Sequence, residues 1–227
     1  MRLADLLRCF PGRGVLQNAA FRTGAIRWWW RYRHFIDGSY CQAPLAMASV
    51  DPHREQLWSL IRPFAPQSLL EVGCGDGANL ALLARRAPTL RLDGVDVNPR
   101  ALAVAKQRVL DAGGTPRIFQ RARADRLPVA TGSVDVALSD AVFMYLPPAQ
   151  AVAALREMRR VARRAAIVHT FADDQALTST IVGGNWVHAF RALVSRAIPG
   201  ARWVRHPSAS VTTGRWRDFG ATYVITW

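Results

Sequence analysis

The residues most suited to binding a ligand lie in one short stretch, Leu69–Ala78, with the sequence LLEVGCGDGA. Three glycines alternate with other residues in it: Gly73, Gly75 and Gly77. Glycine lets the backbone turn tightly and lets a ligand approach closely. The acids Glu71 and Asp76 would repel a pyrophosphate, whereas they would attract a cationic group. The stretch therefore indicates a strand–turn–helix that binds a nucleoside carrying a positive charge.

A third carboxylate, Asp96, ends the run Leu92–Asp96 and follows the glycines at the spacing that nucleotide-binding sheets require. At the tip of a second strand it can accept hydrogen bonds from both hydroxyls of a ribose. Together the acids favour S-adenosylmethionine, which has an adenosine end and a cationic amino-acid end. Two alternatives remain open. One is an NAD-type dinucleotide, because Gly73, Gly75 and Ala78 also satisfy G-x-G-x-x-G/A, and the other is a turn without a ligand.

The elements that must position these residues form a regular series from residue 51 onward. Strands are predicted at 68–72, 90–97, 117–120, 133–139, 165–170, 202–205 and 221–227. Helices are predicted at 53–64, 79–86, 100–112 and 148–164, with a helical stretch at about 174–198. Alternating strands and helices predict an α/β domain over residues 51–227, with a mostly parallel, doubly wound sheet and helices on both faces.

Residues 1–50 differ from this domain because they are basic and rich in aromatic residues, above all at Trp28–Phe35. We interpret them as an N-terminal arm whose aromatic side chains pack on the domain and cover its pocket. Two other interpretations stay open. Trp and Arg together also suit a membrane interface or a lipid-like substrate, and aromatic rings can stack on nucleic-acid bases.

The formal net charge is +14, yet Lys106 is the only lysine and the arginines are spread along the chain. Such a distribution is typical of solvated helix faces, so we do not expect a nucleic acid as the substrate. The three cysteines, Cys9, Cys41 and Cys74, have neither metal-ligand spacing nor a disulfide pattern. Without a signal-peptide pattern or a long apolar run, the sequence predicts a cytoplasmic location.

A third motif completes a family resemblance: A-x-x-L-P at Ala124–Pro128, followed by S-x-D at Ser133–Asp135. With E-x-G-C-G-x-G at Glu71–Gly77 and G-x-D at Gly94–Asp96, the chain resembles the class I S-adenosylmethionine-dependent methyltransferases. The resemblance extends over about residues 50–170. It implies a Rossmann-like, seven-stranded sheet whose last strand is antiparallel.

The resemblance also implies roles for particular residues. Glu71 and Gly73 would contact the methionine end, Gly75 and Gly77 would form the turn, Asp96 would hold the ribose and Val97 would pack on the adenine. One position departs from the family, because Arg123 stands where members often have an adenine-binding Asp. Asp125 could accept from the adenine amino group instead, and the backbone N–H of Ala124 could still bond the ring.

The implied reaction is attack by a substrate nucleophile on the sulfonium methyl group, for which a protein mainly positions the two reactants and excludes water. No catalytic group stands out, although His169 and Tyr145 are candidates for a general base. His34, His53, His188 and His206 have no metal-site spacing, so no metal is expected.

The sequence after the fourth strand narrows the class of methyl acceptor. The Asn-Pro-Pro-Tyr tetrad of many amino-methylating enzymes is absent, and Ser139–Leu146 resembles enzymes that modify small molecules. We therefore expect O-methylation of a small-molecule, sugar or lipid-like acceptor, with Gly183–Trp186 as a flexible lid. The alternatives are a non-catalytic subunit that binds S-adenosylmethionine or a partner, and a nucleic-acid methyltransferase.

Overall fold

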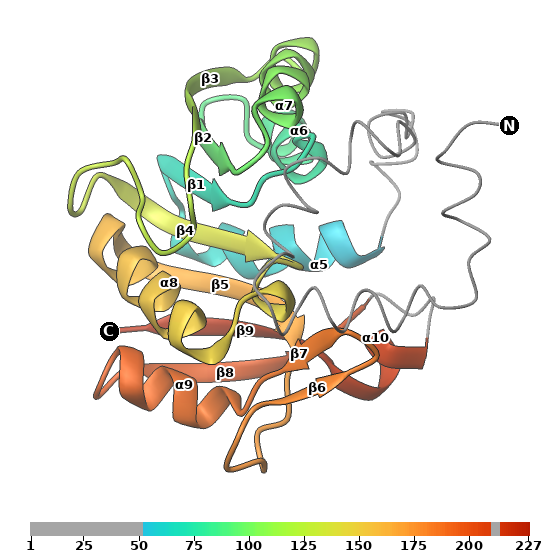
Figure 1. Ribbon diagram of the computed structural model, residues 1–227. Helices are drawn as coiled ribbons and strands as arrows, with labels where there is room; N and C mark the ends of the chain where they lie inside the picture. The colour runs from blue at the N-terminus through green and yellow to red at the C-terminus, as the bar shows by residue number, and fades with distance from the viewer. Residues whose placement is uncertain (1–51, 210–213) are drawn as a thin grey trace, which may run out of the picture.

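The computed structural model describes residues 52–209 and 214–227, so the predicted arm at residues 1–50 lies outside the described residues. A seven-stranded sheet in the order β3-β2-β1-β4-β5-β9-β8 forms the centre of the domain (Figure 1). Its strands are β1 Ser68–Val72, β2 Arg91–Asp96, β3 Thr115–Arg121, β4 Val134–Asp140, β5 Ala162–Phe171, β8 Arg202–Pro207 and β9 Gly220–Thr226. Strand β9 runs antiparallel to both β5 and β8, which confirms the predicted Rossmann-like fold with an antiparallel last strand.

Helices cover both faces of this sheet (Figure 1). One face packs against α5 Pro52–Ile61, α6 Ala78–Arg86 and α7 Pro99–Asp111. The other packs against α8 Pro148–Val161 and α9 Phe190–Ala197. Two short 3-10 turns, η2 Arg62–Phe64 and η3 Phe143–Tyr145, and the helix α10 Gly214–Phe219 complete the helical elements of the described residues.

The inner strands read as apolar runs because both of their faces are covered. All five residues of β1 are buried, and Leu69 pairs with Val136 of β4 on one side and Leu92 of β2 on the other. Helix α7 begins at a local start signal, Asn98-Pro99, one residue before the predicted range. The side chain of Asn98 accepts hydrogen bonds from the backbone N–H of Arg100 and of Ala101, and Pro99 occupies the first helical position.

The predicted helical stretch at 174–198 is wrong over its first part, which contains a hairpin of β6 Thr180–Val182 and β7 Asn185–Val187. Its turn is Gly183-Gly184, with φ of 54° and 81°. Positive φ at both central residues suits the twist of a two-residue hairpin and is easy only for glycine or similar residues. Only α9 remains helical in that stretch. The predicted lid, Gly183–Trp186, thus lies at the hairpin turn.

The junction of α8 with β5 also differs from the prediction. Helix α8 ends at Val161, and β5 begins at Ala162 rather than at residue 165. Helix α10 was not predicted. Among residues 52–209 and 214–227, no helix has the length and hydropathy needed to cross a bilayer.

Candidate functional site

A pocket of about 190 Å³ lies at the carboxyl ends of β1, β2 and β4. Strand order reverses at β1, with β2 and β3 on one side and β4 and β5 on the other, and ligands of open α/β sheets bind at such a point. The pocket is lined by Val72, Gly73, Gly75, residues 95–98, residues 122–125, residues 140–142, Tyr145, Leu146 and Gln150. Six of the eight predicted site residues are in this lining: Gly73, Gly75, Asp96, Val97, Ala124 and Asp125.

The glycine turn after β1 is held by the neighbouring strand. The backbone N–H groups of Gly73 and Cys74 both donate to the carbonyl of Val95, at 2.7 and 3.0 Å. Gly73 has a φ of +77°, and a Cβ on it would lie 2.3 Å from the Val142 side chain. Gly75 has a φ of +51° and open space where its Cβ would be. A ligand can therefore approach the backbone closely at Gly75.

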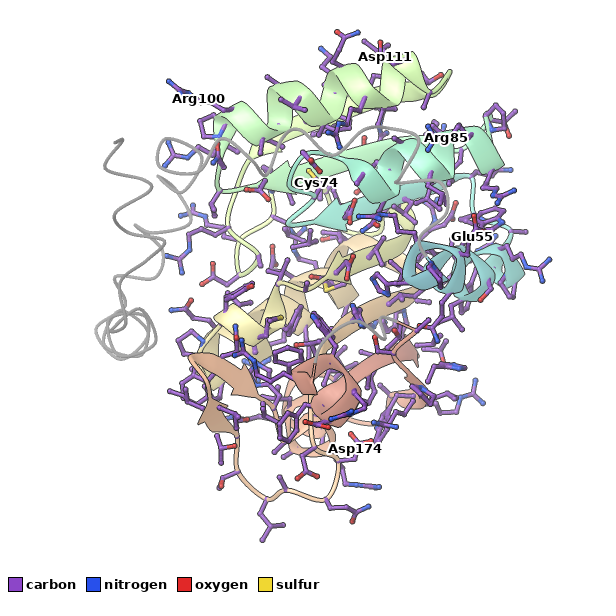
Figure 2. All side chains as sticks on the ribbon, turned by 90° about the vertical axis from the view of Figure 1, so that its right-hand side faces the viewer. Glu55, Cys74, Arg85, Arg100, Asp111 and Asp174 are labelled. Atoms are coloured by element: carbon purple, nitrogen blue, oxygen red, sulfur yellow. The ribbon has the colours of Figure 1, made fainter. Side chains whose placement is uncertain are left out.

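Gly77 does not line the pocket. A Cβ there would lie 2.7 Å from the Cα of Ala105, so this glycine lets α6 pack closely on α7. Asp76 also faces this helix, because its carboxylate forms a 3.0 Å ion pair with Arg108 of α7. Figure 2 shows Cys74 in the turn itself and α7 extending from Arg100 to Asp111. Asp76 and Gly77, the last two residues of the turn, thus contribute to packing rather than to the pocket wall.

Glu71 does not line the pocket but directly precedes the lining residue Val72 in β1. It is 1% exposed, and burial raises the pKa of its carboxyl well above the usual value. Its Oε1 accepts a hydrogen bond from Asn79 Nδ2 at 2.7 Å. The same nitrogen donates to Oδ2 of Asp140 at 2.9 Å. Glu71 Oε2 is buried without a hydrogen-bond partner among the described residues. An unsatisfied buried oxygen is costly, and a cationic ligand group would satisfy it.

Asp96 lies at the opposite wall, at the end of β2. Its Oδ2 accepts from the backbone N–H of Gly75 at 2.9 Å and its Oδ1 from that of Asn98 at 2.8 Å. These two bonds fix the carboxylate between the turn after β1 and the start of α7. An ionised carboxylate has about four acceptor positions, so the ribose hydroxyls of a ligand could add to these bonds. Val97 follows directly in the pocket wall.

Arg123, which stands where the resembling family often has an adenine-binding Asp, pairs with Asp125. The Arg123 guanidinium forms two hydrogen bonds with the Asp125 carboxylate, one from Nε to Oδ1 at 2.7 Å and one from Nη2 to Oδ2. Both residues line the pocket together with Ala124. The hydrogen bonds to Asp125 raise the pKa of Arg123 further. The structure therefore brings the predicted substitute acid to the pocket, but already paired with an arginine.

A cluster of polar side chains adjoins the pocket at the end of β4. Asp140 Oδ1 is 2.7 Å from His169 Nδ1 and 2.9 Å from His53 Nε2. His169 Nε2 is 2.8 Å from Ser208 Oγ. Of these residues only Asp140 lines the pocket. His169, a predicted base candidate, thus reaches the pocket through Asp140.

Sequence reasoning assigned no role to Asp140, Asn79 or His53. Of these three residues, Asp140 has a feature that indicates a site: it lies at the carboxyl end of a strand next to the point where strand order reverses. Asn79 and His53 lie on α6 and α5, and nothing in the local sequence indicates that their side chains meet Asp140.

Apolar and aromatic side chains form the remaining wall beyond β4. Tyr145, the other base candidate, lines the pocket and also packs on a small cluster centred on Met144, Phe171 and Val187. Trp216 of α10 packs on the same cluster and stacks on the His169 ring, with ring centroids 4.3 Å apart. This end of the pocket can therefore exclude water from a ligand.

Comparisons with known proteins agree with this geometry. Residues 69–165 match the family model described as "Methyltransferase domain". The chain is 31% identical over 131 residues to the malonyl-[acyl-carrier protein] O-methyltransferase of Laribacter hongkongensis, covering 55% of this chain and 43% of that protein. It is 36% identical over 121 residues to the methyltransferase GfsG of Streptomyces halstedii, covering 53% of this chain and 42% of that protein. The chain thus spans less than half the length of both relatives.

A solved structure shows the same fold. It is a SAM-dependent methyltransferase from Leishmania major, which superimposes with a TM-score of 0.61 at 15% identity and covers 83% of this chain and 80% of that one. The strand order, the glycine turn at the reversal point and the family match coincide in one stretch of chain. Residues 69–165 of the chain therefore match a methyltransferase domain, and the described residues have the fold of a SAM-dependent methyltransferase.

Proposed function

We propose that the protein transfers a methyl group from S-adenosylmethionine to an oxygen atom of a small-molecule acceptor. The observation that carries the proposal is a pocket at the strand-order reversal with the Asp96 carboxylate in its wall. A second carboxyl group, that of the buried and incompletely bonded Glu71, directly precedes the lining residue Val72. This pair matches the two polar ends of the cofactor, the ribose hydroxyls and the ammonium group.

Within this proposal Asp96 accepts from the ribose, Val97 packs on the adenine, and Gly73 and Gly75 allow close approach of the methionine end. Glu71 is the acceptor for the ammonium group, and its neighbour Asn79 orients it. The backbone N–H of Ala124 bonds the adenine ring. The Arg123–Asp125 pair gives Asp125 a fixed orientation beside the adenine amino group.

The transfer needs little from the protein beyond placement. A lone pair of the acceptor oxygen forms the new O–CH₃ bond while the C–S bond breaks and its electrons return to sulfur, leaving neutral S-adenosylhomocysteine. A hydroxyl acceptor also loses a proton, whereas a carboxylate acceptor does not. The apolar wall around Tyr145 supports exclusion of water from this step.

The acceptor class is inferred from the same wall and from the relatives. A wall that is mostly apolar next to Asp140 suits a small organic acceptor with one polar group. One relative is named for O-methylation of a malonyl group on a carrier protein, which supports an oxygen acceptor. We also propose a cytoplasmic location. It is supported by Cys74, which among the described residues is a buried thiol that forms no disulfide.

The first test measures cofactor binding by calorimetry with S-adenosylhomocysteine. Asp96→Ala should weaken binding at least about tenfold, because it removes charged hydrogen bonds to the ribose of about 1.5–3 kcal/mol. The matched control is Asp111→Ala, which removes an exposed acid at the far end of α7. Absence of binding by the native protein, or equal binding by Asp96→Ala, would refute the cofactor site.

The second test identifies the acceptor. Labelled methyl from S-adenosylmethionine is offered with extract of a strain lacking this protein, and label is then measured in solvent-soluble, aqueous, RNA and protein fractions. We expect label in one small-molecule fraction, and none with Asp96→Ala. Label in RNA or protein would retain methyl transfer and overturn the acceptor class. Cofactor binding without label in any fraction would favour the non-catalytic alternative.

A further inference from the structure

Two imidazole nitrogens and one carboxylate oxygen converge beside the pocket from three separate elements. His53 is on α5, Asp140 ends β4 and His169 lies near the end of β5. One ligand atom from each residue lies within 4.8 Å of the other two. Both histidines approach the same oxygen, Asp140 Oδ1, at 2.9 and 2.7 Å. Such convergence requires something positive between the groups, either a proton for each contact or one cation shared by all three.

We propose that His53, Asp140 and His169 bind one divalent transition-metal ion of the class represented by Zn²⁺ and Co²⁺. Imidazole with carboxylate is a donor set that these ions prefer, whereas Mg²⁺ and Ca²⁺ prefer oxygen ligands alone. Ligand atoms of a tetrahedral ion at about 2.1 Å lie about 3.4 Å apart, so each histidine nitrogen needs to move only about 0.5–0.7 Å away from Asp140 Oδ1.

Further contacts hold the three ligands in position. Asn79 Nδ2 donates to Asp140 Oδ2, the oxygen that does not face the histidines. Ser208 Oγ contacts His169 Nε2, and the Trp216 ring stacks on the imidazole at an interplanar angle of 11°. When His169 Nε2–H donates to Ser208, the lone pair of Nδ1 points at the proposed ion. Outer partners of this kind orient ligands in metal sites.

The three side chains are mostly buried, and of the three only Asp140 lines the pocket. The side chains of His169 and His53 are 1% and 9% exposed, and that of Asp140 is 16% exposed and lines the pocket. Three protein ligands leave a further position for an exogenous ligand. This position would take the acceptor oxygen and hold it toward the methyl group, a role that rests on the proposed function, whereas the metal site itself does not.

The test uses the full chain, stripped of metal with a chelator and titrated with Co²⁺ while the visible d–d absorption is recorded. We expect one Co²⁺ per chain, displaced by Zn²⁺ and unaffected by excess Mg²⁺. His53→Gln and His169→Gln should each weaken Co²⁺ binding at least about 100-fold, and Ser208→Ala about 10- to 100-fold. His206→Gln is the matched control, since it removes a histidine of β8 outside the cluster.

Each variant is first checked for a cooperative thermal transition. If His169→Gln does not fold, His53→Gln decides the matter, because His53 lies on α5 outside the sheet. A folded native protein without Co²⁺ absorption, or full Co²⁺ binding by His53→Gln, overturns the metal site. It would leave the cluster as a hydrogen-bonded group only.

Binding of S-adenosylhomocysteine to the stripped protein is measured in parallel. Retained cofactor binding without Co²⁺ binding would reject the metal site alone. Co²⁺ binding without cofactor binding would support the metal site and reject the proposed function.

Discussion

At the residue scale, the site combines two carboxyl groups, those of the buried Glu71 and the partly exposed Asp140, whose environments shift their pKa values in opposite directions. Burial raises the pKa of Glu71 well above its usual value. Burial also acts to raise the pKa of Asp140, but the charges and hydrogen bonds of His53 and His169 outweigh it and lower that pKa well below the usual value. Asn79 connects the two carboxyl groups through one nitrogen. The raised pKa of Glu71 predicts that cofactor binding depends on pH.

We expect affinity for S-adenosylhomocysteine to fall as the pH falls through the raised pKa of Glu71, because the protonated carboxyl no longer attracts the ligand's ammonium group. Binding near or below that pKa should release a proton, which calorimetry detects as a dependence of the enthalpy on the buffer. Glu71→Gln should bind more weakly and without this proton release. A native protein whose affinity and proton release do not vary with pH would contradict the assignment of Glu71 to the ammonium group.

At the element scale, the β1–α6 turn separates binding from packing within three residues. Gly75 borders the pocket with open space at its Cβ position, whereas Gly77 touches the α7 backbone. Both have positive φ, which costs a non-glycine residue about 1–2 kcal/mol. Only Gly77 adds a steric conflict to that cost.

Gly77→Ala should therefore lower the free energy of unfolding by more than about 2 kcal/mol, since strain and a clash with Ala105 add. Gly75→Ala should cost only the strain and yet weaken S-adenosylhomocysteine binding, because the methyl group enters the pocket wall. Denaturant unfolding and calorimetry on the two variants measure both effects. Equal loss of stability, or unchanged binding by Gly75→Ala, would contradict this division.

The β6–β7 hairpin depends on one side chain from α10. Arg215 Nη1 donates to the carbonyl of Gly183 at 2.6 Å and to Asn185 Oδ1 at 2.8 Å. Arg215→Met should increase amide hydrogen exchange in residues 180–187 while leaving global stability nearly unchanged, because the sheet core does not involve these bonds. Arg217→Met is the matched control, since exposed Arg217 pairs with its neighbour Asp218. Exchange that rises equally in both variants would show that Arg215 does not hold the hairpin.

At the scale of the whole molecule, a buried histidine makes stability depend on pH. His188 Nε2 is 2.8 Å from the carbonyl oxygen of Phe143, and burial lowers the pKa of His188 to about 4. In the unfolded chain its pKa is about 6.5. Between these values the unfolded state binds a proton that the folded state does not, so the free energy of unfolding falls as the pH falls.

The expected loss from His188 is up to about 3 kcal/mol between pH 6.5 and pH 4. His188→Asn should be less stable at neutral pH, because it changes the contact with Phe143, but its stability should fall less steeply over this range. Denaturant unfolding at several pH values compares the two slopes. Identical slopes would show that His188 does not cause the acid sensitivity.

The fold could be predicted because its signals are local. Strands such as β1 are apolar runs that end in glycine, and helix α7 starts at an Asn-Pro pair, so each is visible within a few residues. The hairpin differs from the predicted helix because its two adjacent glycines, Gly183-Gly184, favour a two-residue turn.

The site could be predicted only in part, for the same reason. Six pocket residues follow strand ends and carry motif signals, but the packing role of Gly77 depends on Ala105 of another helix. The meeting of His53 with Asp140 joins residues 87 positions apart. The spacing of residues along the sequence cannot indicate this contact, because it forms only when α5 packs beside the sheet.

The insertion of β9 between β5 and β8 has a consequence for how the protein is made. Strand β8 leaves the ribosome before β9, yet within the seven-stranded sheet β9 is its sole neighbour. Until β9 emerges, the nascent chain carries an open edge on β5 and an unpaired β8. Open edges of this kind invite pairing with other chains. Pairing of β9 with β5 and β8 is therefore the step that closes this sheet against other chains.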